Sequence, residues 1–224
     1  MEEKKVVGYR AASLVEDGMV IGLGTGSTFR YALEKLAQRV QDEGLRFLGV
    51  PTSKDTERRA RAVGVPLTTL DENPVLDLTL DGADEVDKEK NLIKGGGGAL
   101  LREKVVASVS REMIVLVGES KLVEQLGKSF LLPVEVLPFA KRTVYNELKS
   151  MGCSPFLRAG QDGEPFFTDN GNYIIDCKFE GIEDPARLEM KINNIPGAIE
   201  NGLFVGRAGR ILVGKADGTV RELP

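Results

Sequence analysis

Short apolar segments alternate with segments of helical spacing over the first two-thirds of the chain. Strands are expected over 19–23, 47–50, 76–80 and 113–117. Helices are expected over 2–15, 27–40, 54–63 and 99–109. This alternation predicts a parallel sheet with helices on both faces. The tail returns to strands at 210–213 and 219–222, which we expect to complete the same sheet.

A different pattern begins after residue 128. Strands are expected over 131–137, 156–159, 173–178 and 198–200, and helices over 141–151 and 185–195. Their order, β-α-β-β-α-β, is that of the ferredoxin-like fold. The sequence therefore predicts an α/β protein with two domains. Residues 1–128 and 203–224 would form a Rossmann-like catalytic domain, and residues 129–202 a smaller ferredoxin-like α+β domain.

The 224-residue chain contains no histidine, which limits its chemistry. Ser-His-Asp and Cys-His catalysis and every His-ligated metal site are excluded. A general base must then be Asp, Glu, Lys, Tyr or Cys, and carboxylates are the natural candidates. Cys153 and Cys177 lack metal-like spacing and lie in strand-like sequence, so we expect buried, free thiols. We predict no metal site.

The charge pattern argues against nucleic acid or membrane as a partner. The formal net charge is −4, and Lys and Arg form no basic stripe. The apolar runs are far too short to cross a bilayer, and the N-terminus has no apolar signal region. We expect a cytoplasmic protein.

A glycine-rich segment, Gly-Leu-Gly-Thr-Gly-Ser-Thr over 22–28, joins the first expected strand to a helix. Glycine N–H groups and the positive helix start suit an anion, and Ser27 and Thr28 can cap the helix or bind phosphate. A dinucleotide fingerprint would need glycine at Ser27, and no Gly-Lys-Ser/Thr is present for a Walker A loop. We predict a phosphate site formed by Thr25, Gly26, Ser27 and Thr28. The alternative is an ordinary capped turn.

Two carboxylates, Asp81 and Asp84, flank Gly82-Ala83 after the third expected strand. Loop carboxylates are more often turn-forming or solvated than catalytic. In sheets of this kind, however, ligands bind at the carboxyl ends of the strands. We therefore predict that both residues carry protons.

Lys94 precedes four consecutive glycines, 95–98. Glycine loses the most conformational freedom on folding, so such a run indicates a backbone that comes very close to another group. A cation before the run and a carboxylate after it make that group a small polar ligand. Lys121 follows the fourth expected strand and is a candidate phosphate partner.

Glu103 lies on the helix that follows the glycines. On a helical wheel Ala99, Leu100, Val106 and Ala107 surround it, whereas Lys104 and Ser108 mark a polar side. A carboxylate shielded by apolar neighbours becomes a competent base near neutral pH. The alternative, a surface glutamate paired with Arg102 or Lys104, is less consistent with these neighbours. We predict that Glu103 is the general base.

These residues together resemble the signature blocks of type A ribose-5-phosphate isomerase. The blocks are 25–28, 81–84, 94–97 and 102–104, and the segments 131–136 and 167–172 resemble its smaller domain. The similarity covers essentially the whole chain in order. It implies reversible interconversion of D-ribose 5-phosphate and D-ribulose 5-phosphate in the non-oxidative pentose phosphate pathway. It also implies no metal or organic cofactor, and a homodimer or a dimer of dimers.

The resemblance further implies a role for each site residue. Glu103 would move a proton between C2 and C1 through a cis-enediolate, and Lys94 would stabilise the enediolate oxygens. Asp81 and Asp84 would handle hydroxyl protons and help to open the sugar ring. Substrate-binding residues would be Thr25, Gly26, Ser27, Thr28, Asp81, Gly82, Ala83, Asp84, Lys94, Gly95, Gly96, Gly97 and Lys121. Lys4 or Lys5 is a further candidate for phosphate contact.

Other functions fit less well. A sugar-phosphate-sensing module of a transcription regulator would need a DNA-binding segment, for which no basic stretch is available. An amino-sugar-phosphate isomerase or deaminase, or an acyl-CoA transferase, matches the set Asp81, Asp84, Lys94 and Glu103 less closely.

Overall fold

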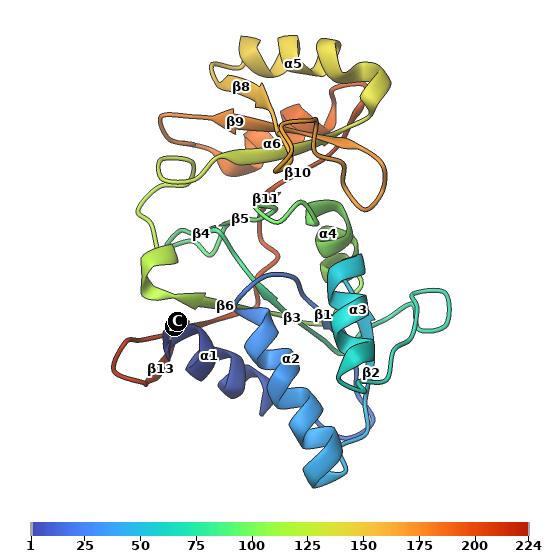
Figure 1. Cartoon of the computed structure of the whole chain (residues 1–224). Helices are drawn as coiled ribbons and strands as arrows, with labels where there is room; N and C mark the ends of the chain where they lie inside the picture. The colour runs from blue at the N-terminus through green and yellow to red at the C-terminus, as the bar shows by residue number, and fades with distance from the viewer. Residues whose placement is uncertain (1, 224) are drawn as a thin grey trace. The chain divides into compact units, whose positions relative to one another are not determined.

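The computed structural model describes residues 2–223, which form two compact units (Figure 1). The first unit comprises Met1–Ala83, Arg102–Lys121 and Arg207–Pro224, and the second Asp84–Leu101 and Leu122–Gly206. The predicted domain boundaries place 84–101, 122–128 and 203–206 with the first domain instead. The structure groups them with the second unit because they pair with one another in a separate small sheet.

The first unit is built on a six-stranded sheet in the order β13-β12-β6-β3-β1-β2. Its strands are β1 (Val20–Leu23), β2 (Leu48–Pro51), β3 (Leu78–Gly82), β6 (Met113–Gly118), β12 (Arg210–Gly214) and β13 (Val220–Leu223). All neighbours are parallel except β12 and β13. The predicted parallel sheet and the return of the tail to it are both confirmed.

Helices cover both faces of this sheet, as predicted. They are α1 (Glu2–Ala12), α2 (Phe29–Gln38), α3 (Lys54–Ala62) and α4 (Leu100–Ser108), the last of which continues from the second unit into the first. Ile21 and Leu23 point into one core with α1 and α2. Val106 of α4 packs with Val50 and Leu76 in another core. After α2 the chain makes a π-helical turn, Arg39–Glu43.

The second unit contains the predicted ferredoxin-like arrangement. Its elements are β7 (Leu132–Val136), α5 (Lys141–Ser150), β8 (Ser154–Leu157), β9 (Tyr173–Lys178), α6 (Pro185–Asn193) and β10 (Ala198–Asn201). The strands form an antiparallel sheet in the order β10-β7-β9-β8. Val144 and Leu148 of α5 and Ile192 of α6 pack into the core of this unit.

A second, three-stranded sheet in this unit was not predicted. It consists of β4 (Glu85–Val86), β5 (Leu92–Ile93) and β11 (Leu203–Phe204), in the order β11-β5-β4. Two-residue strands are too short for a period-2 pattern to be recognised. Short 3-10 helices occur at Glu119–Lys121 and Pro138–Ala140.

Both cysteines are free and buried in the second unit, as predicted. A hydrogen bond with Cys153 and burial both raise the pKa of the Cys177 thiol. Within residues 2–223, no helix has the length and apolar character needed to cross a bilayer.

Candidate active site

Asp81, at the end of β3, lies against the loop that follows β1. Its side chain is fully buried, and its Oδ1 accepts hydrogen bonds from the backbone N–H of Thr25 (2.9 Å) and of Gly82 (2.8 Å). A Cβ on Gly24 would lie 2.3 Å from the same oxygen, so only glycine fits there. The structure therefore brings together two segments that the sequence predicted separately.

The hydroxyl of Thr25 belongs to a polar cluster after β2. Its Oγ1 lies 2.8 Å from Thr52 Oγ1, 2.9 Å from Ser53 Oγ and 3.3 Å from Thr56 Oγ1. Sequence reasoning missed these three residues. Their position after a parallel strand, where β1 and β3 also place polar groups, was the available signal. The cluster fixes the start of the candidate phosphate loop.

The rest of this loop is more accessible. Gly26 and Ser27 are exposed, and Gly26 has a φ of 105°, a backbone conformation that favours glycine. Ser27 Oγ accepts a hydrogen bond from Lys4 Nζ at 2.9 Å. Of the two lysines considered from the sequence, the structure places Lys4 at the loop, whereas Lys5 Nζ lies 5.6 Å from the ring centroid of Tyr9.

Thr28 precedes α2, but its side chain makes no capping hydrogen bond. The expectation that it caps the helix is therefore wrong, because Thr28 already has helical backbone angles (φ −78°, ψ −46°) rather than those of a typical cap. A cavity of about 220 Å³ beside the loop is lined by Gly26, Ser27, Arg30 and Arg59, among others. The lining also includes Asp55, which pairs with Arg59 at 2.6 Å, so the cavity carries both signs of charge.

Glu103 is buried in the first turn of α4, with 5% of its surface exposed. This burial excludes a solvent-exposed position for Glu103. The predicted polar side of the helix is partly wrong, because Lys104 is also only 5% exposed, whereas Val105 is 43% exposed. The protein covers a wider face of α4 than the wheel indicated. Ser108 is exposed, as expected.

Lys121 ends the 3-10 helix after β6 and is half-buried. Because β1, β3 and β6 are parallel, Lys121, the Thr25 loop and Asp81 lie at the same edge of the sheet. The predicted gathering of polar residues at the carboxyl ends of these strands is present in the first unit.

In the second unit, Asp84 is attached to the glycine run. Its Oδ2 accepts a hydrogen bond from Gly96 N–H at 2.8 Å. A Cβ on Gly96 would lie 2.9 and 3.0 Å from the two carboxylate oxygens. Glycine at this position therefore permits the close approach of backbone to carboxylate.

Lys94 is almost fully buried, with 2% exposure. Its backbone N–H donates to Gly202 O at 2.9 Å, and its Nζ lies 5.4 Å from the ring centroid of Phe204. A buried lysine is rare in proteins unless its charge is used or paired. Its placement is consistent with a functional role.

The glycines themselves differ in their surroundings. Gly95 and Gly98 are buried and have φ values of 99° and 81°, whereas Gly96 and Gly97 are exposed. Gly98 N–H donates to Gly95 O at 2.9 Å, which closes a turn. A Cβ on Gly98 would lie 2.6 Å from the ring of Phe166. The run is therefore a tight turn whose middle faces solvent.

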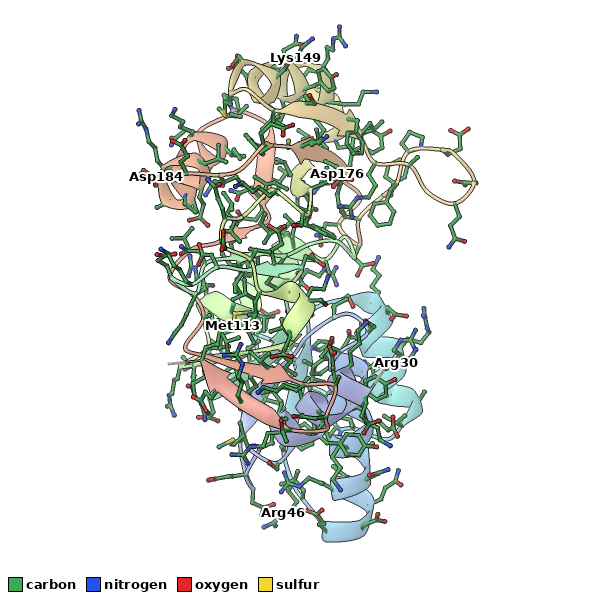
Figure 2. The ribbon with its side chains drawn as sticks, turned by 90° about the vertical axis from the view of Figure 1, so that its left-hand side faces the viewer. Arg30, Arg46, Met113, Lys149, Asp176 and Asp184 are labelled. Carbon is green, nitrogen blue, oxygen red and sulfur yellow. The ribbon has the colours of Figure 1, made fainter. Side chains whose placement is uncertain are left out.

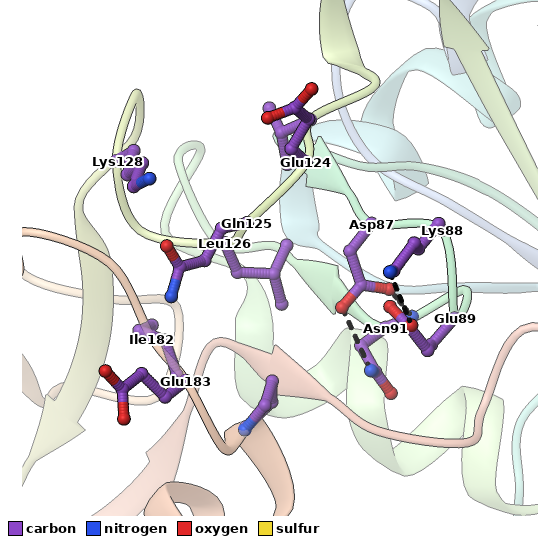
Figure 3. A pocket seen from close by; sticks show the side chains of 12 residues that line it. Asp87, Lys88, Glu89, Asn91, Glu124, Gln125, Leu126, Lys128, Ile182 and Glu183 are labelled. Carbon is purple, nitrogen blue, oxygen red and sulfur yellow. Dashed lines mark hydrogen bonds and ion pairs between the residues drawn. The ribbon is translucent and has the colours of Figure 1, made fainter.

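A larger cavity, of about 860 Å³, lies elsewhere in the second unit (Figure 3). None of the predicted site residues lines it. Two pairs of its polar residues bind each other: Asp87 accepts hydrogen bonds from the backbone and side chain of Asn91, and Lys88 pairs with Glu89 at 3.6 Å. Among the described residues, no group of three or more Cys, Asp or Glu side chains could hold a metal ion.

Comparisons with known proteins show which family the chain resembles. Residues 48–218 match the family model described as ribose 5-phosphate isomerase A (phosphoriboisomerase A). The ribose-5-phosphate isomerase A of Methanoregula boonei is 55% identical over 94% of this chain and 89% of its own length. That of Gloeothece citriformis is 53% identical over 98% of this chain and 95% of its own.

The chain belongs to the ribose-5-phosphate isomerase A family. Solved structures agree: the family member from Methanocaldococcus jannaschii is 45% identical and has a TM-score of 0.94, covering 98% of this chain and 97% of its own. Another ribose-5-phosphate isomerase, solved in complex with phospho-erythronic acid, is 40% identical with a TM-score of 0.94, covering 98% and 96%. The family model spans Asp81, Lys94 and Glu103, and the full-length relatives extend the match toward both ends.

Proposed function

We propose that this chain interconverts D-ribose 5-phosphate and D-ribulose 5-phosphate as an aldose-ketose isomerase of the non-oxidative pentose phosphate pathway. Family membership over nearly the full length supports this activity. The observation that carries the mechanism is the burial of Glu103 in a chain without histidine. It supplies a shielded carboxylate for proton transfer at carbon.

In this mechanism the Glu103 carboxylate takes the proton from C2 of the open-chain aldose. The electrons of the C–H bond form the C1–C2 double bond, and negative charge develops on the sugar oxygens. Glu103 then returns the proton to C1, which gives the ketose. Lys94, with its buried ammonium, stabilises the enediolate oxygens.

Asp81 and Asp84 manage the hydroxyl protons and assist ring opening. Asp81 is held by two backbone N–H groups and Asp84 by Gly96, so each carboxylate has a fixed orientation. Such orientation before the reaction reduces the entropy that must be lost in the transition state. Gly82, Ala83, Gly95 and Gly97 contact the substrate through their backbone.

Phosphate binds at the loop of residues 25–28 together with Lys121 and Lys4. The exposed Gly26 and Ser27, and the 2.9 Å contact of Lys4 with Ser27, support this assignment. The relative that binds phospho-erythronic acid adds chemical support, because a carboxylate on a phosphorylated four-carbon chain resembles an enediolate in charge and shape. No cofactor takes part.

We further propose that the protein is a cytoplasmic homodimer. The resemblance implies this assembly, and the second unit exposes apolar side chains that an interface would cover: Phe139 is 96% exposed, Phe167 56% and Leu137 42%. Light scattering coupled to size exclusion would measure the mass. A monomeric mass at assay concentration would contradict the assembly.

Solvent exchange tests the isomerase assignment directly. In heavy water, deuterium should enter C1 of ribulose 5-phosphate during turnover, because the base exchanges its proton with solvent. Mass spectrometry of the ribulose 5-phosphate that is formed would measure its deuterium content. If the enzyme forms no ribulose 5-phosphate when it is incubated with ribose 5-phosphate, the proposed function is excluded.

Chelation is expected to leave turnover unchanged. The chain has no histidine and its proposed base is a carboxylate, so no step requires a metal ion. Initial rates would be compared before and after dialysis against excess chelator. Activity lost on dialysis and restored by a divalent cation would contradict this prediction.

Gly26→Val is expected to raise KM for ribose 5-phosphate while the protein stays folded. The valine side chain would not itself close the loop, because a Cβ at Gly26 meets nothing within 4 Å. The cause is instead the φ of 105°, which a β-branched residue does not adopt, so the loop must change shape. Steady-state kinetics with and without added inorganic phosphate would measure KM for ribose 5-phosphate and the competition by phosphate.

In the unmodified protein, phosphate should compete with the substrate, and free ribose should bind far more weakly than ribose 5-phosphate. Gly64→Val is a matched control: Gly64 also has positive φ (75°) and open surroundings, but it follows α3 at the opposite end of that helix from the loop. Equal affinity for ribose and its phosphate would exclude the phosphate site.

A further inference from the structure

Arg158 is held firmly in the second unit, just after β8. Its guanidinium forms a two-bond fork with Asp176 of β9, at 2.8 Å (Nε to Oδ2) and 2.6 Å (Nη2 to Oδ1); Asp176 is labelled in Figure 2. The two side chains are only 15% and 7% exposed. The backbone N–H of Arg158 donates to Ile174 O at 2.8 Å, and the guanidinium carbon of Arg158 lies 5.7 Å from the ring centroid of Phe166. The orientation of the guanidinium is therefore fixed.

The third guanidinium nitrogen, Nη1, reaches the glycine run. Nη1 donates to Gly95 O at 3.1 Å and to Gly96 O at 3.0 Å. These carbonyls belong to the peptides 95–96 and 96–97. A fixed arginine thus holds two successive glycine peptides that are more than 60 residues away in the sequence.

Because the peptide bond is planar, holding these two carbonyls also sets the direction of the N–H groups in the same peptides. In a trans peptide the C=O and the next N–H point in opposite directions, and the described residues contain no cis peptide bond. With both carbonyls directed at Arg158, the N–H groups of Gly96 and Gly97 must be directed away from it. The 2.8 Å bond from Gly96 N–H to Asp84 agrees with this direction.

Glycine peptides need such a constraint. Without a Cβ, a glycine run has many accessible backbone conformations, and a rotated peptide would present a carbonyl oxygen where an N–H is required. N–H groups stabilise developing negative charge only if they are oriented before the reaction. A buried ion pair contributes little net stability compared with apolar residues of similar volume, so stability alone does not explain Arg158 and Asp176.

We propose that Arg158, held by Asp176, is a positioning residue for the isomerisation. It keeps Gly97 N–H available to the enediolate oxygens and keeps Gly96 N–H on Asp84. This inference rests on the proposed roles of Lys94, Asp84 and the glycine run. Arg158 itself does not touch the substrate.

The main test is Arg158→Met, compared with Arg210→Met. Arg210 forms a similar fork with Glu112 (2.8 and 3.1 Å), but at the amino end of β12 and without a contact to the glycine run. Arg158→Met should lower kcat by about tenfold or more and weaken phospho-erythronic acid binding by a similar factor. Inhibition by inorganic phosphate should change by less than about twofold, because the phosphate loop is intact. Arg210→Met should leave all three values unchanged.

Two further variants separate positioning from folding. Arg158→Met/Asp176→Leu removes both charges, so no unpaired carboxylate is left buried if the single variant does not fold. It should show the same loss of kcat as the single variant. In Arg158→Ala, added guanidinium ion should restore part of the lost kcat.

Normal kcat in folded Arg158→Met would overturn the inference. So would an equal loss of phosphate and phospho-erythronic acid binding without guanidinium rescue, since that pattern indicates a structural role. Lys94→Met separates failure of the positioning role from failure of the site assignment. If Lys94→Met is inactive and Arg158→Met is normal, only the positioning role fails; if both are normal, the assignment of the site fails with it.

Discussion

Glu103→Gln should lower kcat by about 10²–10⁴-fold, the range typical of a lost general base. Glutamine keeps the size and much of the hydrogen-bonding shape of glutamate, but it cannot accept a proton from carbon. KM and phosphate binding should change little, because the loop of residues 25–28 and Lys94 remain. The variant should unfold at the same or a slightly higher temperature, since functional sites often sacrifice stability.

Glu135→Gln is the matched control for this substitution. Glu135 is also a buried glutamate, but its Oε1 accepts hydrogen bonds from Thr168, Asn170 and Asn172 within the second unit. Its replacement should lower stability and leave kcat per folded enzyme within a few-fold. Steady-state kinetics and thermal unfolding on both variants measure the difference. Near-normal turnover of Glu103→Gln would move the base to Asp81 or Asp84.

Lys94→Met should also reduce kcat strongly, by about 10²–10³-fold, as expected when one electrostatic stabiliser of an oxyanion is lost. Methionine fills a similar volume beside Phe204, so the fold should persist. Affinity for phospho-erythronic acid should fall with kcat, because both depend on negative charge near the sugar oxygens.

Lys104→Met provides the comparison, because Lys104 is also a buried lysine, at 5% exposure, and has no proposed role in the reaction. Its kcat should stay within a few-fold of the unmodified enzyme. If Lys104→Met loses as much activity as Lys94→Met, burial of a cation rather than its place beside the glycine run would account for the effect. Stopped assays of both variants at saturating substrate would decide.

The sequence predicted most elements because their signals are local. Apolar runs such as 113–117 and the helical spacing of 27–40 are contained in single windows, and the sheet follows from their alternation. The position of polar residues at strand ends then predicted Asp81, the 25–28 loop and Lys121 as neighbours. The burial of Glu103 was predicted from its helical neighbours.

What sequence reasoning missed depends on contacts between distant segments. The hydroxyls of Thr52, Ser53 and Thr56 meet Thr25 across neighbouring strands, and Arg158 reaches glycines in another part of the chain. Neither contact leaves a periodic pattern. The burial of Lys104 was missed for a related reason: a helical wheel shows which residues share a side, not how much of the helix is covered.

The position of β12 has a consequence for how the chain is made. This strand lies inside the six-stranded sheet, between β6 and β13, although residues 119–209 separate it from β6 in the sequence. During synthesis β6 therefore lacks its β12 neighbour until the whole segment between the two strands has been made, and until then the edge of β6 offers unpaired backbone groups to other chains. The four strands of the ferredoxin-like sheet are all available earlier. The nascent chain is consequently most prone to aggregate while the second unit can already be folded and β6 still lacks its partner.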